Sequence, residues 1–529
     1  MNDVERLKSE KDGLDVWADI LRYAKEGFAA IHPDDFTRMR WYGLYQQKPN
    51  EGHFMLRVRV PGGELSSTQV RAFGDISRLY GGSIADITTR QTFQFHWLTP
   101  ESFPEVFRLL AEAGLSSAGA CGDILRNITG CPVAGIDPDE ILDARPVIAE
   151  IDRFFLCNHE FSNLPRKYKT SVAGCCLHCA QPEINDIGVS GVRRKRADGR
   201  EEVGFQIRVG GGLSARPFLA KHLNMFVPPE KLLSVFVAVT TIFRDFGNRD
   251  NRKKARLKFL VDEWGAERFE EEVRARLDWK PDAAVEWPEP RNSFRDHLGV
   301  HAQKQEGLNW IGVCVTVGRL KSDQILEIAR IAEAFGSGNI RTTNQQNFLI
   351  SNVPTARVDE AVKAIEAIGL VVNPTAFRRA AVACTGNEFC NLALTETKLL
   401  MREIVDHLEA SSVVIEEPLR INLNGCPNSC GQHHIGQIGL QGCLVKQPGG
   451  VTVDGYDISL GGRLGAGARF VRPIWRKVPA TNLKYAIENL LTGYLEHREP
   501  DEDFSDFVDR TPDEELASLM KTEFAEGTV

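Results

Sequence analysis

Two pairs of cysteines near the C-terminal end of the chain have the types and spacing of a metal site. Cys384 and Cys390 stand six residues apart in ACTGNEFC, and Cys426 and Cys430 stand four apart in GCPNSC. We expect a helix over Asn391–Leu408 between the pairs, which would turn the chain back and bring the four thiols together. Thiolates are soft ligands, and the surrounding glycine, asparagine and proline let the backbone wrap closely around a metal.

The spacing favours one kind of metal centre over the others. Structural zinc sites usually leave about two residues between paired cysteines, whereas these pairs leave five and three. That spacing suits a [4Fe–4S] cluster better than zinc. A zinc site, and a set of buried and inert cysteines, remain the two alternatives.

An internal duplication of the chain predicts the elements that must position these cysteines. Residues 54–70 (FMLRVRVPGGELSSTQV) and 309–325 (NWIGVCVTVGRLKSDQI) both predict a strand, a glycine turn and the start of a helix. Each block continues through an amphipathic helix into a second strand, at 85–98 and at 338–353, and then into another helix. This order predicts a split βαβ unit of ferredoxin-like topology in each half.

The repeat extends to the cysteine loop itself. TSVAGCCLHCAQPEINDIGVSG at 170–191 matches NLNGCPNSCGQHHIGQIGLQG at 422–442 with an offset of 251 residues, and 205–213 matches 456–464 at the same offset. Four blocks in the same order predict an α+β fold. In it, two ferredoxin-like half-domains and two larger α/β domains are related by a pseudo-twofold axis. Ligands then tend to bind in the crevices between duplicated parts.

Composition excludes several other classes of protein. The 529 residues are 42% apolar and 26% charged with a net charge of −8, so we expect no nucleic-acid partner. The longest apolar run, Leu232–Phe243, is too short for a membrane helix and predicts a buried helix, so we expect no membrane association. The charged N-terminus lacks a secretory h-region, and we expect a cytoplasmic protein with reduced thiols.

The cysteine pattern resembles the signature of the sirohaem-dependent sulfite and nitrite reductases. C-x5-C followed by N-G-C-x3-C is the shared motif, and the resemblance covers nearly the whole chain, including its duplicated plan. It implies that Cys384, Cys390, Cys426 and Cys430 hold a [4Fe–4S] cluster. Cys430 would also be the axial thiolate of the sirohaem, coupling the cluster to the iron that binds substrate. A non-catalytic iron–sulfur or zinc scaffold is the rival interpretation, and an absorption spectrum showing sirohaem would distinguish the two.

The resemblance also implies a domain division and a cationic substrate pocket. The expected segments are an N-terminal extension (1–50), a ferredoxin-like half-domain (51–118), a sirohaem and substrate domain (119–290), a second half-domain (291–375) and a cluster domain with an acidic tail (376–529). The pocket residues would bind the anion and deliver protons. They are Arg90, expected on a strand, Arg126, expected in a glycine-flanked turn, and Lys167 and Lys169, expected on one face of a strand.

The second lysine bears on the choice of substrate. In the family, the sulfite-reducing branch typically has K-x-K, and the ferredoxin–nitrite reductases of plants and cyanobacteria have K-x-N. This chain has Lys167-Tyr168-Lys169, and a doubly charged sulfite is favoured by the additional cation. Residues 133–146 are more similar to the nitrite branch. We therefore expect the six-electron reduction of sulfite to sulfide, with nitrite to ammonia as the alternative.

Further cations and thiols lie outside these motifs. At the expected start of a helix, every second position of the segment 251–259 (NRKKARLKF) is a cation: Arg252, Lys254, Arg256 and Lys258. We expect some of these four side chains to face sirohaem carboxylates. The same role is open to Arg38, Arg40, Arg57 and Arg59. In the internal repeat, Cys175 and Cys179 of the first half align with Cys426 and Cys430 of the second. Cys121 and Cys131 flank Arg126 in the sequence. We expect these to be thiols near the cofactor, and a second metal site is the alternative.

The electron donor must come from outside the chain. No strand–GxGxxG–helix unit and no GxxxxGK[ST] motif is present, so an internal nicotinamide or flavin domain is not expected. A ferredoxin, which is acidic, is the expected donor, and its dock should be a local basic patch at 193–196 or 252–258.

Overall fold

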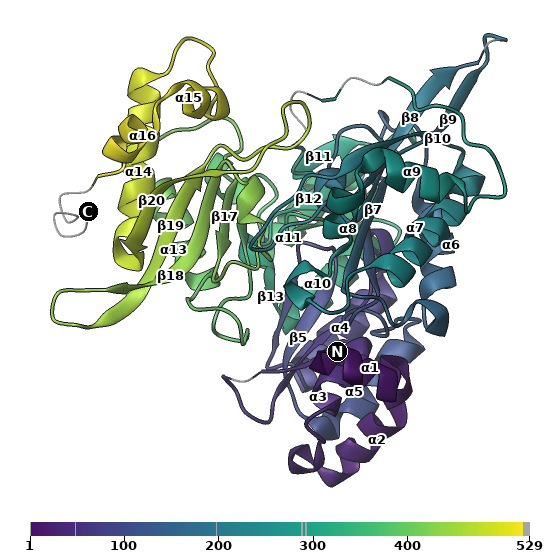
Figure 1. The fold of residues 1–529 in the computed structure, drawn as a ribbon. Helices are drawn as coiled ribbons and strands as arrows, with labels where there is room; N and C mark the ends of the chain where they lie inside the picture. Colours follow the sequence, from purple (N-terminus) through teal and green to yellow (C-terminus); the bar gives the residue numbers. More distant parts are fainter. Residues whose placement is uncertain (1, 48, 197, 287–288, 291–293, 522–529) are drawn as a thin grey trace. The chain divides into compact units, whose positions relative to one another are not determined.

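The computed structural model describes residues 2–47, 49–196, 198–286, 289–290 and 294–521 (Figure 1). They form two compact units. The first takes in the described residues of Met1–Gly212, Phe218–Val313 and Arg319–Val372, and the second those of Leu213–Pro217, Cys314–Gly318 and Asn373–Val529. No helix in this described part of the chain is long and apolar enough to cross a membrane.

Two antiparallel sheets of the first unit come from the repeated strand–helix–strand blocks. One has the order β1-β2-β5-β4-β13 and the other β11-β12-β15-β14-β3. Their strands are β1 (Leu44–Gln46), β2 (Phe54–Arg57), β3 (Glu64–Ser66), β4 (Ile84–Ile87), β5 (Phe93–Leu98), β11 (Gly299–Ala302), β12 (Leu308–Val313), β13 (Arg319–Lys321), β14 (Asn339–Thr342) and β15 (Phe348–Pro354). Their helices are α4 (Ser67–Leu79), α5 (Phe103–Glu112), α10 (Ser322–Phe335) and α11 (Val358–Ala367). The two expected ferredoxin-like units are confirmed.

The two half-domains exchange one short strand each. β3 of the first block pairs with β14, and β13 of the second block pairs with β4. The helices that follow these strands, α4 and α10, pack against each other. Gly74 permits the close approach, since a Cβ there would stand 2.6 Å from the Leu326 side chain. The half-domains are therefore intertwined, which the sequence did not predict.

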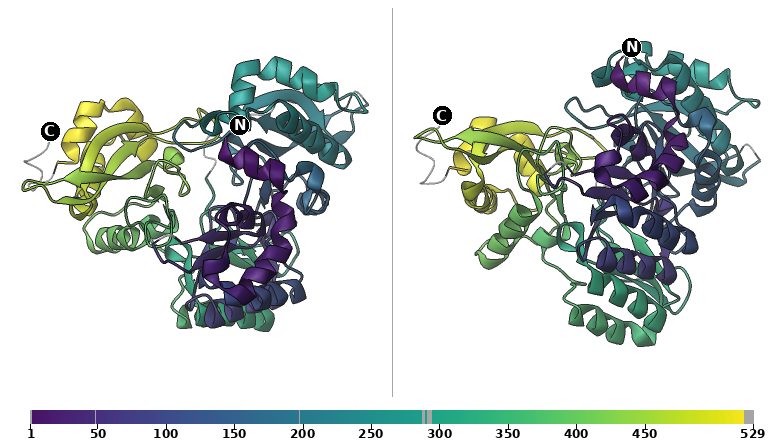
Figure 2. Two further views of the ribbon diagram at one scale, coloured as in Figure 1. Left: turned by 60° about the horizontal axis from the view of Figure 1, so that its bottom comes forward. Right: turned by 90° about the horizontal axis from the view of Figure 1, so that it is seen from below.

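The N-terminal helices are tied to the rest of the first unit by buried polar contacts. They are α1 (Asp3–Glu10), α2 (Trp17–Glu26) and α3 (Asp35–Arg38). Lys8 Nζ donates to the Leu164 carbonyl at 2.8 Å, and Asn2 Nδ2 donates to that of Arg249 at 2.6 Å. Figure 2 shows these purple helices beside the blue and teal segments that they contact.

The third sheet of the first unit has the order β10-β9-β8-β7-β6. Its strands are β6 (Leu125–Gly130), β7 (Tyr168–Ala173), β8 (Ile187–Lys195), β9 (Glu201–Val209) and β10 (Lys221–Val227), and its helices are α6 (Arg145–Phe155), α7 (Leu232–Phe246), α8 (Leu257–Trp264) and α9 (Ala266–Arg274). β6, β7 and β8 are parallel, whereas β9 and β10 are antiparallel. α7 is the apolar run expected to form a buried helix, and its side chains join the core of this domain.

The second unit repeats that domain. Its sheet has the order β16-β17-β18-β19-β20, again with the first three strands parallel. Its strands are β16 (Ala381–Ala383), β17 (Ile421–Asn424), β18 (Ile438–Lys446), β19 (Thr452–Leu460) and β20 (Arg472–Pro479), and its helices are α12 (Ala376–Arg379), α13 (Lys398–Ala410), α14 (Ala480–His497), α15 (Phe504–Arg510) and α16 (Asp513–Leu519). Val172 pairs with Val189 in one sheet and Leu423 with Leu440 in the other, which keeps the offset of 251. The duplicated α+β fold is confirmed.

Candidate functional site

The two cysteine pairs of the second unit lie at one edge of its sheet. Cys384 directly follows β16, and Cys426 and Cys430 lie in the loop after β17, its parallel neighbour. The backbone N–H of Cys384 donates to the Leu423 carbonyl at 3.1 Å, and that of Gly425 donates to the Cys384 sulfur at 3.3 Å. Because carboxyl ends of parallel strands share an edge, the sheet brings both loops together.

A glycine lets the second loop fold closely onto the first. A Cβ on Gly431 would stand 2.6 Å from the Leu423 carbonyl oxygen and 2.9 Å from the backbone nitrogen of Cys384. Any larger residue would have to push the two cysteine loops apart. The packing of Cys384 against the Cys430 loop therefore depends on glycine at this position.

The segment between the cysteine pairs differs from the expected helix. α13 begins at Lys398, not near Asn391, and the preceding residues are bonded to the cysteine loops instead. The Leu394 N–H donates to the Gly425 carbonyl at 2.7 Å, and the Thr397 hydroxyl donates to the Cys384 carbonyl at 2.7 Å. These contacts connect the segment before α13 to both cysteine loops.

The four thiols act on one another through their charges. Burial, and after it the neighbouring Cys430, raises the pKa of Cys384 to about 12. Burial also raises the pKa of Cys390, with further contributions from Cys430 and Cys426. Four thiolates here would repel each other, so a bound metal cation is what makes their deprotonation favourable.

The separation of the sulfurs bears on which metal they suit. Among the described residues, no three of these four sulfurs lie within 4.8 Å of one another. Four thiolates on one zinc ion at about 2.3 Å would stand about 3.8 Å apart. The wider arrangement fits an iron–sulfur cube, whose ligands bind four different iron atoms.

A cationic group forms the second candidate element, in the first unit: the buried Arg126 and the half-buried Arg90, Lys167 and Lys169. Arg90 lies in the turn between β4 and β5, not on a strand as expected. It donates to the Asn185 side chain at 2.9 Å and to the carbonyls of Asn127 and Thr170 at 2.6 and 3.0 Å. Burial, and then the nearby Arg126, lowers the pKa of Arg90 to about 9. The charged form of the Arg90 guanidinium is therefore unfavourable in free energy, and an anion bound next to it would stabilise that form.

Arg126 and the two lysines come from neighbouring strands. Arg126 is on β6, not in a turn, and its guanidinium donates to the carbonyls of Gly122 and Ala120 at 2.9 and 3.2 Å. β6 pairs with β7 in parallel, with Leu125 opposite Tyr168. Lys169 is on β7, whereas Lys167 directly precedes that strand and is not on it as expected. Both flank the buried Tyr168, so the two lysines lie on the opposite face of the chain.

The cations at 252–258 are arranged differently from the expectation. α8 begins at Leu257, and Arg252 and Lys254 lie in a 3₁₀ turn before it, so the four cations do not start one helix. Arg252 pairs with Asp123 at 2.8 Å, and Arg256 pairs with Asp186 at 2.6 Å. Lys254 is exposed, whereas Lys258 is buried beside the rings of Phe218 and Phe259.

Sequence reasoning missed the groups that hold these cations in place. Asn127 and Asn185 orient Arg90, and the buried Asp186 binds both Arg256 and the backbone N–H of Lys169, the latter at 2.7 Å. The available signal for Asp186 was its place between Asn185 and the apolar Ile187, directly before the strand predicted by the repeat.

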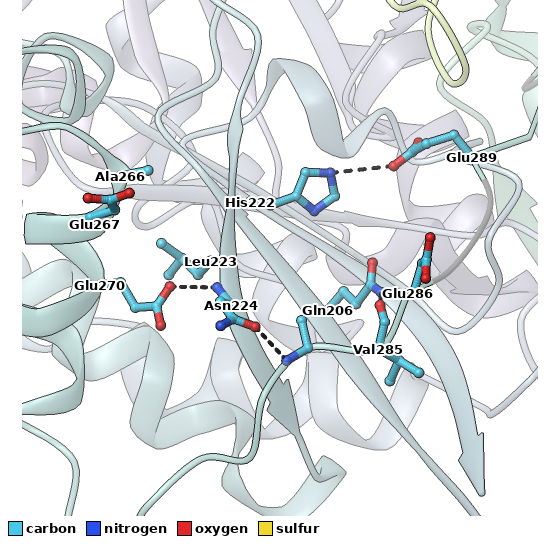
Figure 3. A pocket seen from close by; sticks show the side chains of 11 residues that line it. Gln206, His222, Leu223, Asn224, Ala266, Glu267, Glu270, Val285, Glu286 and Glu289 are labelled. Carbon is cyan, nitrogen blue, oxygen red and sulfur yellow. Dashed lines mark hydrogen bonds and ion pairs between the residues drawn. The ribbon is translucent and has the colours of Figure 1, made fainter.

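One sizeable pocket of the first unit does not belong to this group. Its volume is about 420 Å³, and Figure 3 shows the side chains that line it. Four of them are glutamates: Glu267, Glu270, Glu286 and Glu289. Such a lining repels anions, so the pocket is not a site for an oxyanion substrate.

Comparison with protein families matches almost the whole chain. The model for the nitrite and sulphite reductase 4Fe-4S domain matches residues 121–281 and 375–526. The model for the nitrite/sulfite reductase ferredoxin-like half domain matches residues 45–113 and 301–368.

Individual proteins match over nearly their full length. A sulfite reductase [ferredoxin] of Mycobacterium tuberculosis is 37% identical, over 98% of this chain and 96% of its own length. A ferredoxin–nitrite reductase of Leptolyngbya laminosa is 39% identical, over 94% of this chain and 97% of its own. The solved structure of the Mycobacterium tuberculosis NirA protein superposes with a TM-score of 0.92 at 36% identity, covering 97% of both chains. The chain therefore belongs to the nitrite and sulfite reductase family.

Proposed function

We propose that this protein reduces sulfite to sulfide with electrons from ferredoxin. The observation that carries the proposal is the half-buried Arg90, whose guanidinium is fixed by Asn185 and by the carbonyls of Asn127 and Thr170, with Arg126 near it. Sulfite reductases that use ferredoxin are among the relatives that match over the whole chain.

Family membership implies two cofactors, a [4Fe–4S] cluster and sirohaem. We propose that Cys384, Cys390, Cys426 and Cys430 hold the cluster, and the convergence of the two cysteine loops supports this. Cys430, the exposed member of the set, would also bind the sirohaem iron and so link the two cofactors for electron transfer. Arg252, Lys254 and Arg256 are the proposed partners of its carboxylates.

Each residue of the cationic group has a proposed task. When bound, the two cofactors supply the electrons for SO₃²⁻ + 6 e⁻ + 7 H⁺ → HS⁻ + 3 H₂O. Arg90 and Arg126, whose guanidinium groups are fixed by backbone carbonyls, hold the anion and stabilise negative charge on its oxygens. Lys167 and Lys169, which are partly exposed, deliver protons to those oxygens and are reprotonated from solvent.

Nitrite reduction to ammonia is the second candidate, because ferredoxin–nitrite reductases match this chain equally well. The lysine pair favours sulfite. A dianion gains about twice as much as a monoanion from each nearby ammonium. The same chain is expected to reduce both anions, with sulfite preferred.

Paired kinetics with the ferredoxin-linked holoenzyme test this assignment. Lys169→Asn removes one ammonium, so we expect kcat/KM for sulfite to fall about tenfold more than kcat/KM for nitrite. Lys221→Asn, at an exposed position on β10, is the control and should leave the ratio unchanged. An unchanged ratio in Lys169→Asn would remove the basis for preferring sulfite.

The ferredoxin dock is proposed on exposed cations of the first unit. At 193–196, Arg194 and Arg196 both pair with Glu202, and Arg194 also pairs with Asp282, so two carboxylates balance these two cations. Arg193 is exposed and pairs with Glu201 at 3.8 Å, whereas Lys195 on the same strand end and Lys253 and Lys254 in the 252–258 region are exposed. We place the reaction in the cytoplasm, where ferredoxin and reduced thiols coexist.

A further inference from the structure

Two asparagine side chains of β17 hold the residue that follows Cys430. The Gly431 N–H donates to Asn424 Oδ1 at 2.6 Å, and Asn422 Nδ2 donates to the Gly431 carbonyl at 2.8 Å. Asn422 and Asn424 stand two residues apart on the strand, so both side chains project from the same face. They are 5% and 1% exposed, which shields these bonds from solvent. Both backbone polar groups of Gly431 are therefore fixed by buried amides.

A buried histidine determines which way the Asn424 amide faces. His433 Nδ1 lies 3.1 Å from Asn424 Nδ2, and the His433 side chain is 2% exposed. The amide nitrogen can only donate, so Nδ1 of His433 is the acceptor and the amide oxygen is directed toward Gly431. The opposite orientation would set two donors against each other at Gly431. The contact with His433 therefore keeps an acceptor in front of the Gly431 N–H.

The loop after β7, the first-half counterpart of the cluster loop, has the same backbone conformation. The strand register gives an offset of 251 residues between the two loops. Each has two left-handed residues at matching positions: φ is 58° at His178 and 56° at Gln181, against 56° at Ser429 and 64° at Gln432. The duplication therefore preserved the shape of the loop.

The two amides are not part of what was preserved. At the offset of 251, Ser171 and Ala173 occupy the places of Asn422 and Asn424. Alanine has no polar side-chain atom, and in the described part of the chain Ser171 Oγ is buried without a hydrogen-bond partner. The loop thus takes its shape without the amides, so their presence beside Cys430 calls for a reason other than folding of the loop.

Other N–H groups of the same site donate to cysteine sulfurs. The Gly425 N–H donates to Cys384 Sγ at 3.3 Å, and Asn428 Nδ2 donates to Cys426 Sγ at 3.4 Å. Such donors raise the reduction potential of an iron–sulfur cluster, because they stabilise its reduced and more negative state. The Gly431 N–H is in the peptide unit that follows Cys430, but Asn424 accepts it.

We propose that Asn424 is a positioning residue for the cluster: by accepting the Gly431 N–H, it keeps this donor away from the Cys430 sulfur. The role rests on the proposed function, in which Cys430 binds the cluster and links it to the sirohaem. One N–H fewer on that sulfur leaves the thiolate richer in electrons and keeps the cluster potential lower. A lower potential increases the driving force for electron transfer toward the bound anion.

A redox titration of the holoenzyme, followed by the paramagnetic resonance of the reduced cluster, tests the proposal. Asn424→Leu has a similar volume but no acceptor, so the Gly431 N–H should turn toward Cys430 and the cluster potential should shift to a more positive value. Asn424→Ala should shift it in the same direction, and this variant carries the residue that the first-half domain accommodates at Ala173. Asn424→Asp keeps an oxygen in front of Gly431 and should show no positive shift.

Asn309→Leu is the matched control for the loss of a buried amide. Asn309, on β12 of the first unit, is 8% exposed and donates to the Thr355 hydroxyl at 2.9 Å. This variant should be less stable than the wild type but have the same cluster potential.

Two results would overturn the proposed role of Asn424. One is a potential that is unchanged or more negative in both Asn424→Leu and Asn424→Ala. The other is an equal positive shift in Asn424→Asp, because altered packing alone would then explain the effect. Neither depends on which anion the enzyme reduces. A wild type without any cluster would instead refute the cofactor assignment in the proposed function, so the two failures are distinguishable.

Discussion

Asp186 is the carboxylate on which the cationic group depends, and Asp186→Asn tests that dependence. Its side chain is fully buried, binds Arg256 through both oxygens at 3.1 and 2.6 Å, and accepts the backbone N–H of Lys169. Asparagine keeps the shape and one acceptor but removes the charge. Arg256, 8% exposed, is then left as a buried cation near other cations.

The expected cost is large because only one partner of a buried ion pair is lost. Such changes destabilise proteins by about 3–5 kcal/mol, much more than loss of a surface pair. Most of the chain's tryptophans belong to the first unit, which also contains Asp186. Urea unfolding followed by tryptophan fluorescence therefore reports on the stability of this unit. Glu105→Gln breaks the exposed ion pair with Arg108 and is the matched control, with no measurable change expected.

A second measurement separates the electrostatic role of Asp186 from a purely packing role. The carboxylate raises the pKa of Arg90 and so offsets part of the positive potential there. Without it, sulfite should raise the unfolding midpoint of the variant more than that of the wild type, because the anion replaces the missing negative charge. A variant within about 1 kcal/mol of the wild type, or one that sulfite stabilises less, would refute this account of the cationic group.

Three further outcomes follow from the same structure. Burial lowers the pKa of His433 to about 3, so the folded chain keeps it neutral while the unfolded chain protonates it below about pH 6.5. His433 alone should therefore lower the stability by up to about 1.4 kcal/mol per pH unit from there toward pH 3, and His433→Gln should make the pH dependence in urea titrations less steep by that amount. Gly431→Ala should lower iron content and cluster absorbance, since its Cβ meets the backbone at 2.6 Å, and full iron loading would contradict the proposed loop packing. Turnover with ferredoxin should decrease as ionic strength rises from about 0.05 to 0.3 M, whereas salt-insensitive turnover would argue against a charged dock.

The duplication and the cysteine set could be predicted because both depend on local patterns. Alternating strands, glycine turns and repeated loops are visible within short windows of sequence, and an offset of 251 residues links them. The exchange of β3 and β13 could not be predicted. Each is three residues long, and nothing in Glu64–Ser66 or Arg319–Lys321 distinguishes pairing within a block from pairing across blocks.

The elements that carry Arg90 and Arg126 were predicted wrongly, and in opposite directions: Arg90 was expected on a strand and lies in a turn, whereas Arg126 was expected in a turn and lies on β6. Thr88 and Thr92 have high β propensity, but their hydroxyls bond to each other at 2.7 Å across a turn that presents Arg90. Arg126 follows glycine-rich sequence, yet all six residues of β6 are buried in a parallel sheet, and tertiary packing decides their conformation. In both cases the residue type was informative about chemistry, whereas its element depended on a local hydroxyl contact for Arg90 and on tertiary packing for Arg126.

The groups that balance the buried cations were the least predictable part of the site. A motif search finds residues that meet a ligand, but Asp186 and Asn185 meet only other side chains and the backbone. Their role follows from the cost of burying Arg90 and Arg256 without partners.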